Sequence, residues 1–208
     1  MATAIEQPVE AKKPHVEEGP GLTLRRFTPD EYSRMSDAGI LAAEERTELL
    51  KGIVVAMMSR RLPHDEAILN LDEAFRPLCP ADFHLRFQLA LSLHDSCPEP
   101  DCAVIRGARK RGQNRFPTVG EVELIVEVSD STLRTDQQVK SCIYARAGVP
   151  TNWIVNLEAR QLEVLTEPTG DATEPAYAKT TIFKPGEKVP FTLAGTVVGE
   201  IAVADLLP

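Results

Sequence analysis

The sequence predicts a single α/β domain in which a mixed central β-sheet is flanked by helices. The chain has 208 residues, which is enough for one domain with a sizeable core. Its apolar fraction of 43% and charged fraction of 26% are ordinary for a globular protein. Along the chain, segments with helical spacing of apolar residues alternate with short β-branched runs that end in Gly, Pro or Asp.

The N-terminal segment differs from the rest of the chain. Residues 1–21 are polar and contain no apolar stretch of the kind that a secretory signal needs. We expect them to form a disordered tail and the single domain to occupy residues 22–208. No segment approaches the roughly 18 apolar residues of a membrane span. The four cysteines show no CxxC spacing, so we expect reduced thiols, a cytoplasmic protein and no membrane partner.

Two helices and a hairpin are expected in the first part of the domain. Residues Thr28 to Glu31 supply an N-cap, a proline at the first helical position and the acid that completes a capping box. The Lys51-Gly52 pair predicts the tight turn of a β-hairpin over residues 48–58. Apolar residues at three- and four-residue spacing predict a second helix from Pro63 to Leu78.

Most of the sheet should come from the second half of the chain. Asp101–Ile105 is expected to be a strand, and residues 83–93 one or two more. After a loop rich in Gly, Arg and Pro, the run Val122–Val128 is typical of a strand buried on both faces at the sheet centre. Thr135 begins a second capping box and helix. Further strands are expected over residues 153–155, 161–165, 177–183, 189–193 and 196–203.

Two acids stand at the ends of neighbouring predicted strands. Asp101 begins one strand and Glu127 ends another, so antiparallel pairing would bring both to the same edge of the sheet. Carboxylate oxygens on a rigid sheet suit Mg²⁺, and a bound metal lowers the pKa of its water. Lys140, in the helix that follows Glu127, has a side chain long enough to reach back towards this edge. The residues therefore predict a site for Mg²⁺ and a phosphodiester.

Each of these residues also has an ordinary structural explanation. An aspartate after proline, such as Asp101, is most often a turn residue, and Glu127 could be an exposed strand end. Asp136 and Lys140 at i,i+4 could form a surface ion pair worth ~0.3–0.5 kcal/mol. The combination of two acids and a lysine at one sheet edge favours the metal site over these separate explanations.

The charge of the chain restricts how it could contact nucleic acid. A net charge of −8 excludes a protein that coats nucleic acid through bulk electrostatics, so any contact has to be local. One loop offers such a contact, which we expect to be with the DNA backbone. Its basic residues are Arg106, Arg109, Lys110, Arg111 and Arg115.

The chain resembles the Uma2 family (DUF820), a branch of the PD-(D/E)xK nuclease superfamily. The resemblance rests on a set of segments in the family's order: ERTELLKGIVVAMM, Pro63-His64, PEPDCAVIRG, ELIVEVSDSTLRTDQQVKSCIYARAGVPTNWIVNL and a strand-rich tail that ends in DLLP. It implies a restriction-endonuclease-like core, which consists of a helix, three antiparallel strands, a helix and a further strand.

The resemblance also implies a set of catalytic residues. Asp101 matches the first acid of the superfamily and Glu127 the second, while Glu48 resembles an additional family acid near the metal. These three would hold Mg²⁺, or Mn²⁺ in its place. His64 resembles a family histidine near the site. The complete implied set is Asp101, Glu127, Lys140, Glu48 and His64.

The chain departs from the superfamily pattern at one position. The usual lysine two positions after the second acid is replaced by Ser129, and Lys140 matches the position from which Uma2-like proteins supply it. Glu48 could equally be an exposed hairpin residue. His64, close to the start of a helix, could be a cap or a surface residue.

Three functions are consistent with these residues. The first is a Mg²⁺-dependent endonuclease that hydrolyses DNA as a homodimer, so that two sites cut two strands. The second is a non-catalytic DNA- or protein-binding module on the same fold. The third is a metal-dependent hydrolase of another phosphoester, such as RNA or a nucleotide. Only the second would keep its function in an Asp101→Ala variant.

Overall fold

The computed structural model describes residues 16–19, 22–42, 44–109 and 116–208. The tail expected over residues 1–21 therefore falls largely outside the described residues. Within that range, Val16–Gly19 forms strand β1, which pairs antiparallel with β2 (Leu22–Arg25).

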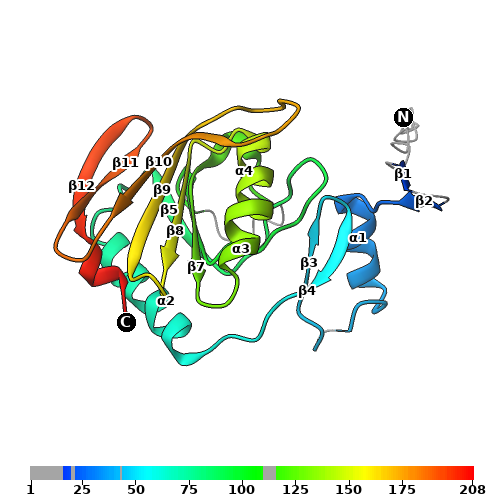
Figure 1. Ribbon diagram of the computed structural model, residues 1–208, viewed down its shortest axis with the longest axis horizontal. Helices are drawn as coiled ribbons and strands as arrows, with labels where there is room; N and C mark the ends of the chain where they lie inside the picture. Colours follow the sequence, from blue (N-terminus) through cyan, green and yellow to red (C-terminus); the bar gives the residue numbers. More distant parts are fainter. Residues whose placement is uncertain (1–15, 20–21, 43, 110–115) are drawn as a thin grey trace, which may run out of the picture.

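A mixed six-stranded sheet forms the centre of the molecule (Figure 1), in the order β10-β9-β8-β7-β6-β5. Its strands are β5 (Phe83–Phe87), β6 (Cys102–Arg106), β7 (Val122–Ser129), β8 (Thr151–Asn156), β9 (Gln161–Pro168) and β10 (Tyr177–Phe183). Strands β7 and β8 run parallel, and all other neighbouring pairs are antiparallel. The α/β fold class with a mixed central sheet is confirmed.

Strand β7 lies inside the sheet because its sequence is apolar on both faces. All eight of its residues are buried. Leu124 and Val126 point into one hydrophobic core together with Trp153, whereas Ile125 points into a second core on the other face. Burial of each such side chain stabilises the fold by about 1.5–3 kcal/mol. The strand predicted at the sheet centre is therefore confirmed.

Helices cover both faces of this sheet. Helix α2 (Leu62–Phe75) packs Leu71 and Phe75 into the core that contains Trp153. The same core includes residues of the hairpin formed by β11 (Lys188–Leu193) and β12 (Thr196–Ala202). Helix α4 (Ser141–Ala147) covers the opposite face. Among the described residues, no helix is long and apolar enough to cross a membrane.

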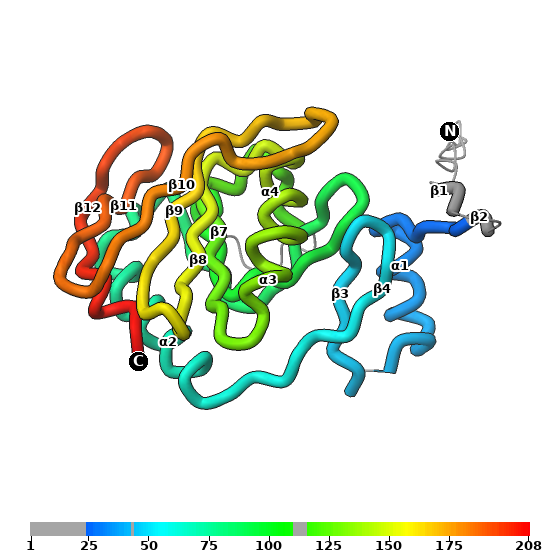
Figure 2. Tube along the Cα trace, in the orientation of Figure 1, coloured from blue at the N-terminus to red at the C-terminus, as the bar shows by residue number. Residues whose placement is uncertain are grey.

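A smaller N-terminal part lies at the other end of the molecule from β11 and β12 (Figure 2). It contains α1 (Pro29–Asp37), with the predicted capping box, and the antiparallel hairpin of β3 (Thr47–Leu50) and β4 (Ile53–Ala56). The expected turn is present, with Lys51 and Gly52 both at positive φ. Backbone hydrogen bonds between Leu49 and Cys97 attach the hairpin to the chain that leads into β6.

The helix after β7 begins differently from the prediction. Its first residues form α3 (Leu133–Thr135), followed by a π-helical turn η2 (Asp136–Lys140) that continues into α4. The capping box predicted at Thr135 is wrong, because this residue lies inside the helix and caps nothing. The hydroxyl of Thr132, the observed N-cap residue, donates instead to the Asp136 carboxylate at 2.6 Å.

Candidate functional site

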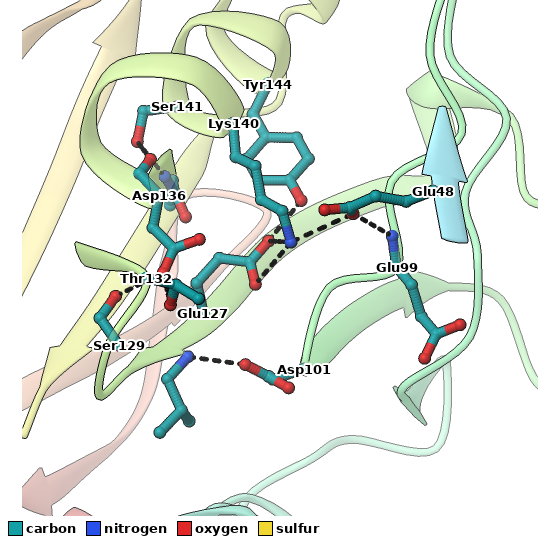
Figure 3. A network of polar contacts seen from close by, with 12 residues as sticks. Glu48, Glu99, Asp101, Glu127, Ser129, Thr132, Asp136, Lys140, Ser141 and Tyr144 are labelled. Carbon is teal, nitrogen blue, oxygen red and sulfur yellow. Dashed lines mark hydrogen bonds and ion pairs between the residues drawn. The ribbon is translucent and has the colours of Figure 1, made fainter. Parts of the chain in front are cut away.

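The predicted acids meet at one edge of the sheet. Strands β6 and β7 are antiparallel, and Cys102 faces Val126 in their register. Asp101 directly precedes Cys102 and Glu127 directly follows Val126, so the two acids lie next to each other. Figure 3 shows both side chains directed towards the space below the helix that follows β7.

Glu127 is held in a buried position by two groups of that helix. The residue is only 2% exposed, and its carboxylate accepts a hydrogen bond of 2.5 Å from the Tyr144 hydroxyl. The Lys140 ammonium lies 3.4 Å from Oε1 and 3.5 Å from Oε2 of Glu127. Burial raises the pKa of Glu127 well above its ordinary value, while the positive charge of Lys140 opposes this rise.

Lys140 joins two strands through its ammonium group. Its Nζ lies 3.2 Å from Oε2 of Glu48 as well as beside Glu127. Burial disfavours the ammonium form, but the two carboxylates outweigh burial and raise the pKa of Lys140 above its ordinary value. Lys140 is therefore a permanent cation between two acids.

Glu48 comes from β3 and is buried, with 5% of its surface exposed. Its Oε2 also accepts a hydrogen bond from the backbone N–H of Glu99 at 3.3 Å. The alternative that Glu48 is an exposed hairpin residue is wrong. The β3–β4 hairpin lies outside the central sheet (Figure 1), but the Glu48 side chain reaches from β3 towards Lys140 (Figure 3).

Asp101 is fixed from two sides. Its Oδ2 accepts a hydrogen bond of 2.8 Å from the backbone N–H of Val128 and lies 3.2 Å from Nε2 of His64. Burial lowers the pKa of His64, but the hydrogen bond and the charge interaction with Asp101 together raise it by more. The pKa of His64 therefore lies above its ordinary value. His64 is thus neither the cap of α2, which is Arg61, nor a free surface residue.

Asp136 is a fourth buried acid and lies in the helix that follows β7, at the start of η2. Its Oδ2 accepts hydrogen bonds from Ser129 at 2.7 Å and from Thr132, and its backbone carbonyl accepts one from Ser141. The expected alternative of a surface ion pair with Lys140 is wrong, because both side chains are buried. Ser129, which stands where the resemblance implied a departure from the expected lysine, donates a hydrogen bond from its hydroxyl to Asp136.

Asp136 and Tyr144 contribute to the site, although the sequence alone assigns no role in the site to either. Both lie four residues from Lys140, on the same face of its helix. The i, i+4, i+8 spacing of these three polar residues on a helix that must cover a buried strand was the available signal. A stripe of this kind needs buried partners, and β7 supplies them in Glu127 and Ser129.

These side chains line a pocket of about 500 Å³, which we call the acidic pocket. Its other acids are matched by arginines: Glu99 pairs with Arg46 and Arg60, and Asp130 pairs with Arg61. The buried acids outnumber the buried cation, so the pocket favours a further positive charge. Its buried charged residues are Glu48, Asp101, Glu127, Asp136 and Lys140.

The donor set of the acidic pocket fits a hard divalent cation. Asp101 and Glu127 are adjacent carboxylates, and Mg²⁺ binds through one or two carboxylates while keeping several waters. Within the described parts of the chain, no three acidic, histidine or cysteine side chains are gathered into a ready-made ligand cluster. The position of Lys140 between Glu48 and Glu127 accounts for this spacing, since an ammonium already bridges those two carboxylates.

The basic loop is only partly described. Arg106 is committed to a buried carboxylate, since its Nε donates to Glu123 Oε1 at 2.9 Å. Arg109 is exposed. Lys110, Arg111 and Arg115 lie outside the described residues, so the expected contact of this loop with DNA stays a prediction.

Comparison with known proteins found a family model and a solved structure that match the chain. The model of the Uma2 family, described as "Putative restriction endonuclease", matches residues 29–198. Among curated proteins, none matches the chain. A crystal structure from Anabaena variabilis, described as "a putative nuclease belonging to DUF820", has a similar fold with a TM-score of 0.61 at 15% identity. The similarity covers 86% of this chain and 97% of that chain, and at this identity it concerns the fold alone.

Proposed function

This chain belongs to the Uma2 family, and from that premise we propose that it is a metal-dependent endonuclease that hydrolyses DNA phosphodiester bonds. One observation carries the proposal. Asp101 from the residue before β6, Glu127 from β7 and Lys140 from the following helix are buried side chains that meet in one pocket. An ammonium beside adjacent carboxylates is a suitable arrangement for a metal ion and a phosphate.

The carboxylates of the acidic pocket have distinct tasks in this proposal. Asp101 and Glu127, with Glu48 as a third acid, would hold Mg²⁺ or Mn²⁺. When bound, the metal supplies a water of lowered pKa and offsets negative charge that develops on the phosphate. His64 keeps the Asp101 carboxylate in place, and Tyr144 does the same for Glu127.

Lys140 is the residue that would contact the scissile phosphate. An ammonium has three hydrogen-bond donors and no acceptor. Contacts with Glu48 and Glu127 use two donors, and the third is left for a phosphate oxygen or for the attacking water. Because its pKa is raised, Lys140 stays charged over the whole working range of pH. It therefore acts through charge and position rather than as a general base.

The proposal also includes the substrate and the oligomeric state. DNA is the expected substrate, with RNA or a nucleotide as the alternative phosphoester. A homodimer would place two such sites on two strands. Both are open to direct measurement by substrate comparison and by sedimentation.

A non-catalytic binding module on the same fold is the second candidate. The ion pairs of Lys140 with Glu48 and Glu127 favour it, since they satisfy these carboxylates without a metal. In that case the acidic pocket would be a structural centre, and DNA or protein would bind elsewhere on the surface.

Plasmid nicking separates the two candidates. We expect the wild type to nick supercoiled DNA with Mg²⁺ or Mn²⁺, and Asp101→Asn to lose this activity by at least about a hundredfold, as transition-state contacts are worth several kcal/mol. Asp95→Asn is the matched control, because Asp95 forms an ion pair with Arg146 outside the acidic pocket. Equal nicking by wild type and Asp101→Asn, or none by either, would refute the endonuclease.

A further inference from the structure

A second depression lies along strand β5 and has a volume of about 810 Å³. We call it the β5 groove. It shares no lining residue with the acidic pocket. Strand β5 is the last strand in the sheet order and pairs only with β6 among the described strands. The groove is therefore formed at a free edge of the sheet.

Basic side chains dominate the charged lining of the β5 groove: Arg76, His84, Arg86, Arg106 and Arg109. Two of these arginines are neutralised by neighbours. Arg76 pairs with Asp72, and Arg106 pairs with Glu123. The acid that lines the groove in the described part of the chain is Glu121, which accepts hydrogen bonds from Thr118.

Arg86 and Arg109 are not neutralised in this way. Within the described residues, neither forms an ion pair with an acid. Among the described residues, the buried Nε of Arg86 has no hydrogen-bond partner, and its Nη2 donates only to the carbonyl of Ala90 at 3.4 Å. A buried N–H donor without a partner is rare in folded proteins, since leaving it unmade costs about 1–3 kcal/mol.

The two guanidinium groups also repel each other. Burial and the nearby charge of Arg109 both lower the pKa of Arg86. The overall charge of the chain is −8, so acids are plentiful, yet among the described residues none forms an ion pair with Arg86 or Arg109. Two like charges that converge on a groove favour an anionic ligand, because an anion between them removes the repulsion and supplies the missing acceptor.

We propose that Arg86 and Arg109 bind a phosphate of a nucleic-acid backbone in the β5 groove, beyond the strand segment that is cleaved. This inference rests on the proposed function, and it assigns to the same substrate a second contact outside the acidic pocket. Arginine suits the task because its planar guanidinium can bind phosphate oxygens through two parallel hydrogen bonds.

The β5 groove and the acidic pocket adjoin at the end of β5. Phe87 and Leu89 line the groove, and Gln88 between them accepts a hydrogen bond of 2.7 Å from Nη1 of Arg60. Arg60 in turn lines the acidic pocket. A nucleic-acid strand could therefore pass from the acidic pocket over this contact into the groove, where Phe87 and Leu89 offer apolar surface for sugars and bases.

A polyanion fits the groove better than an extended peptide. A free sheet edge can also accept a strand from a second copy of the chain through main-chain hydrogen bonds. Such pairing uses main-chain groups and would bring no acid to Arg86 and Arg109. The second copy would also carry the same net charge of −8, so the two copies would repel each other. We therefore assign the groove to nucleic acid, and the test includes the second copy as an outcome.

The test measures binding of a fluorescent DNA duplex by anisotropy, with the full chain and without divalent metal so that no cleavage occurs. The main variant is Arg86→Gln with Arg109→Gln. Arg109→Glu is a second variant that cannot disturb the core, because Arg109 is exposed. Arg76→Gln is the matched control, since Arg76 lines the same groove but is paired with Asp72.

We expect the double variant to bind DNA roughly tenfold more weakly, with a salt dependence reduced by about one unit of slope for each arginine that contacts a phosphate. Arg109→Glu should weaken DNA binding at least as much as loss of the single contact between Arg109 and a phosphate. Arg76→Gln should leave the DNA affinity and the slope of its salt dependence unchanged. Circular dichroism shows that each variant is folded before its affinity is compared.

Other outcomes would overturn the inference. The first is a double variant that binds DNA as Arg76→Gln does, and the second is a wild type that binds no DNA. A third is binding of inorganic phosphate, seen by phosphorus NMR and lost in the double variant, while DNA affinity stays the same. A fourth is loss of self-association in the variant with DNA affinity unchanged, which would make a second copy the occupant.

Failure of the groove and failure of the proposed function can be told apart. A wild type that needs Arg86 and Arg109 to bind DNA but does not nick plasmid supports the groove and refutes the endonuclease. A wild type that nicks plasmid while the double variant binds DNA normally supports the endonuclease and refutes the groove.

Discussion

Lys140 is the single residue that most affects the electrostatic balance of the acidic pocket. Its ammonium is the buried cation between Glu48 and Glu127, both of which are almost fully buried. Removal of one partner from a buried ion pair leaves an uncompensated charge, which is far more damaging than loss of an exposed pair. The stability of the fold should therefore depend on this one side chain.

We predict that Lys140→Met lowers the free energy of unfolding by about 3 kcal/mol at pH 8, because Glu48 and Glu127 lose their counterion. Urea unfolding measures this difference. Lys188→Met is the control, since its ion pair with Glu200 is exposed and 4.0 Å long, and it should change stability by less than about 0.5 kcal/mol.

The difference in unfolding free energy between wild type and Lys140→Met should depend on pH. The direction of this dependence follows from the raised pKa of Glu127. A carboxyl group whose folded pKa lies above its unfolded value of 4.5 lowers stability as pH rises beyond that value, because the unfolded chain ionises first. Removal of Lys140 raises the pKa of Glu127 further. The gap between wild type and Lys140→Met should be small near pH 4 and widen towards pH 8. A gap that narrows with rising pH would contradict this account of Glu127.

Among the secondary-structure elements, the β3–β4 hairpin has a clear structural role, because it carries Glu48 to the edge of the sheet. Its turn lies against the chain before α1. The N–H of Phe27 donates to the carbonyl of Gly52, and a Cβ atom at Gly52 would lie 2.5 Å from Cβ of Arg26. Glycine is therefore required there by both close approach and its φ of +75°.

We predict that Gly52→Ala shifts the hairpin and with it Glu48. Gly195→Ala is a matched control, because Gly195 has a φ of +76° in the β11–β12 turn and open space around it. Both variants should lose roughly 1 kcal/mol through positive φ. Gly52→Ala should lose about 1–3 kcal/mol more from overpacking, and its nicking activity should fall while that of Gly195→Ala is kept. Equal unfolding free energies of the two variants would show that the close approach to Arg26 is unimportant.

The elements also show what the sequence could predict. The strands Asp101–Ile105 and Val122–Val128 were found from their apolar runs, and antiparallel pairing was enough to bring Asp101 and Glu127 together. The start of the next helix was not found. Thr135 fits a capping box locally, but the helix begins earlier because buried Asp136 needs the hydroxyls of Thr132 and Ser129. This tertiary requirement overrides a local signal.

The whole molecule adds features that no local pattern contains. The exposed or buried state of Glu48 was undecided in the sequence, because it depends on how the hairpin docks against residues 95–99. The β5 groove depends on two arginines from different segments, Arg86 and Arg109, which form no ion pair with an acid among the described residues. Neither feature has a periodicity that a sequence reading could detect.

The two depressions give the molecule a consistent division of tasks. The acidic pocket would hold a metal and the cleaved phosphate, while the β5 groove would hold the strand beyond it. This division explains how a chain with a net charge of −8 could bind a polyanion, since the contacts are confined to one metal site and one short basic edge.

Isothermal titration calorimetry with Mg²⁺ and Mn²⁺ tests the central claim most directly, because it measures the metal without relying on a substrate. The comparison is between wild type, the double variant Asp101→Asn with Glu127→Gln, and the control Asp95→Asn. We predict saturable binding by the wild type and the control and none by the double variant. Equal binding by all three proteins, or no binding by the wild type, would contradict the claim that these carboxylates form a metal site.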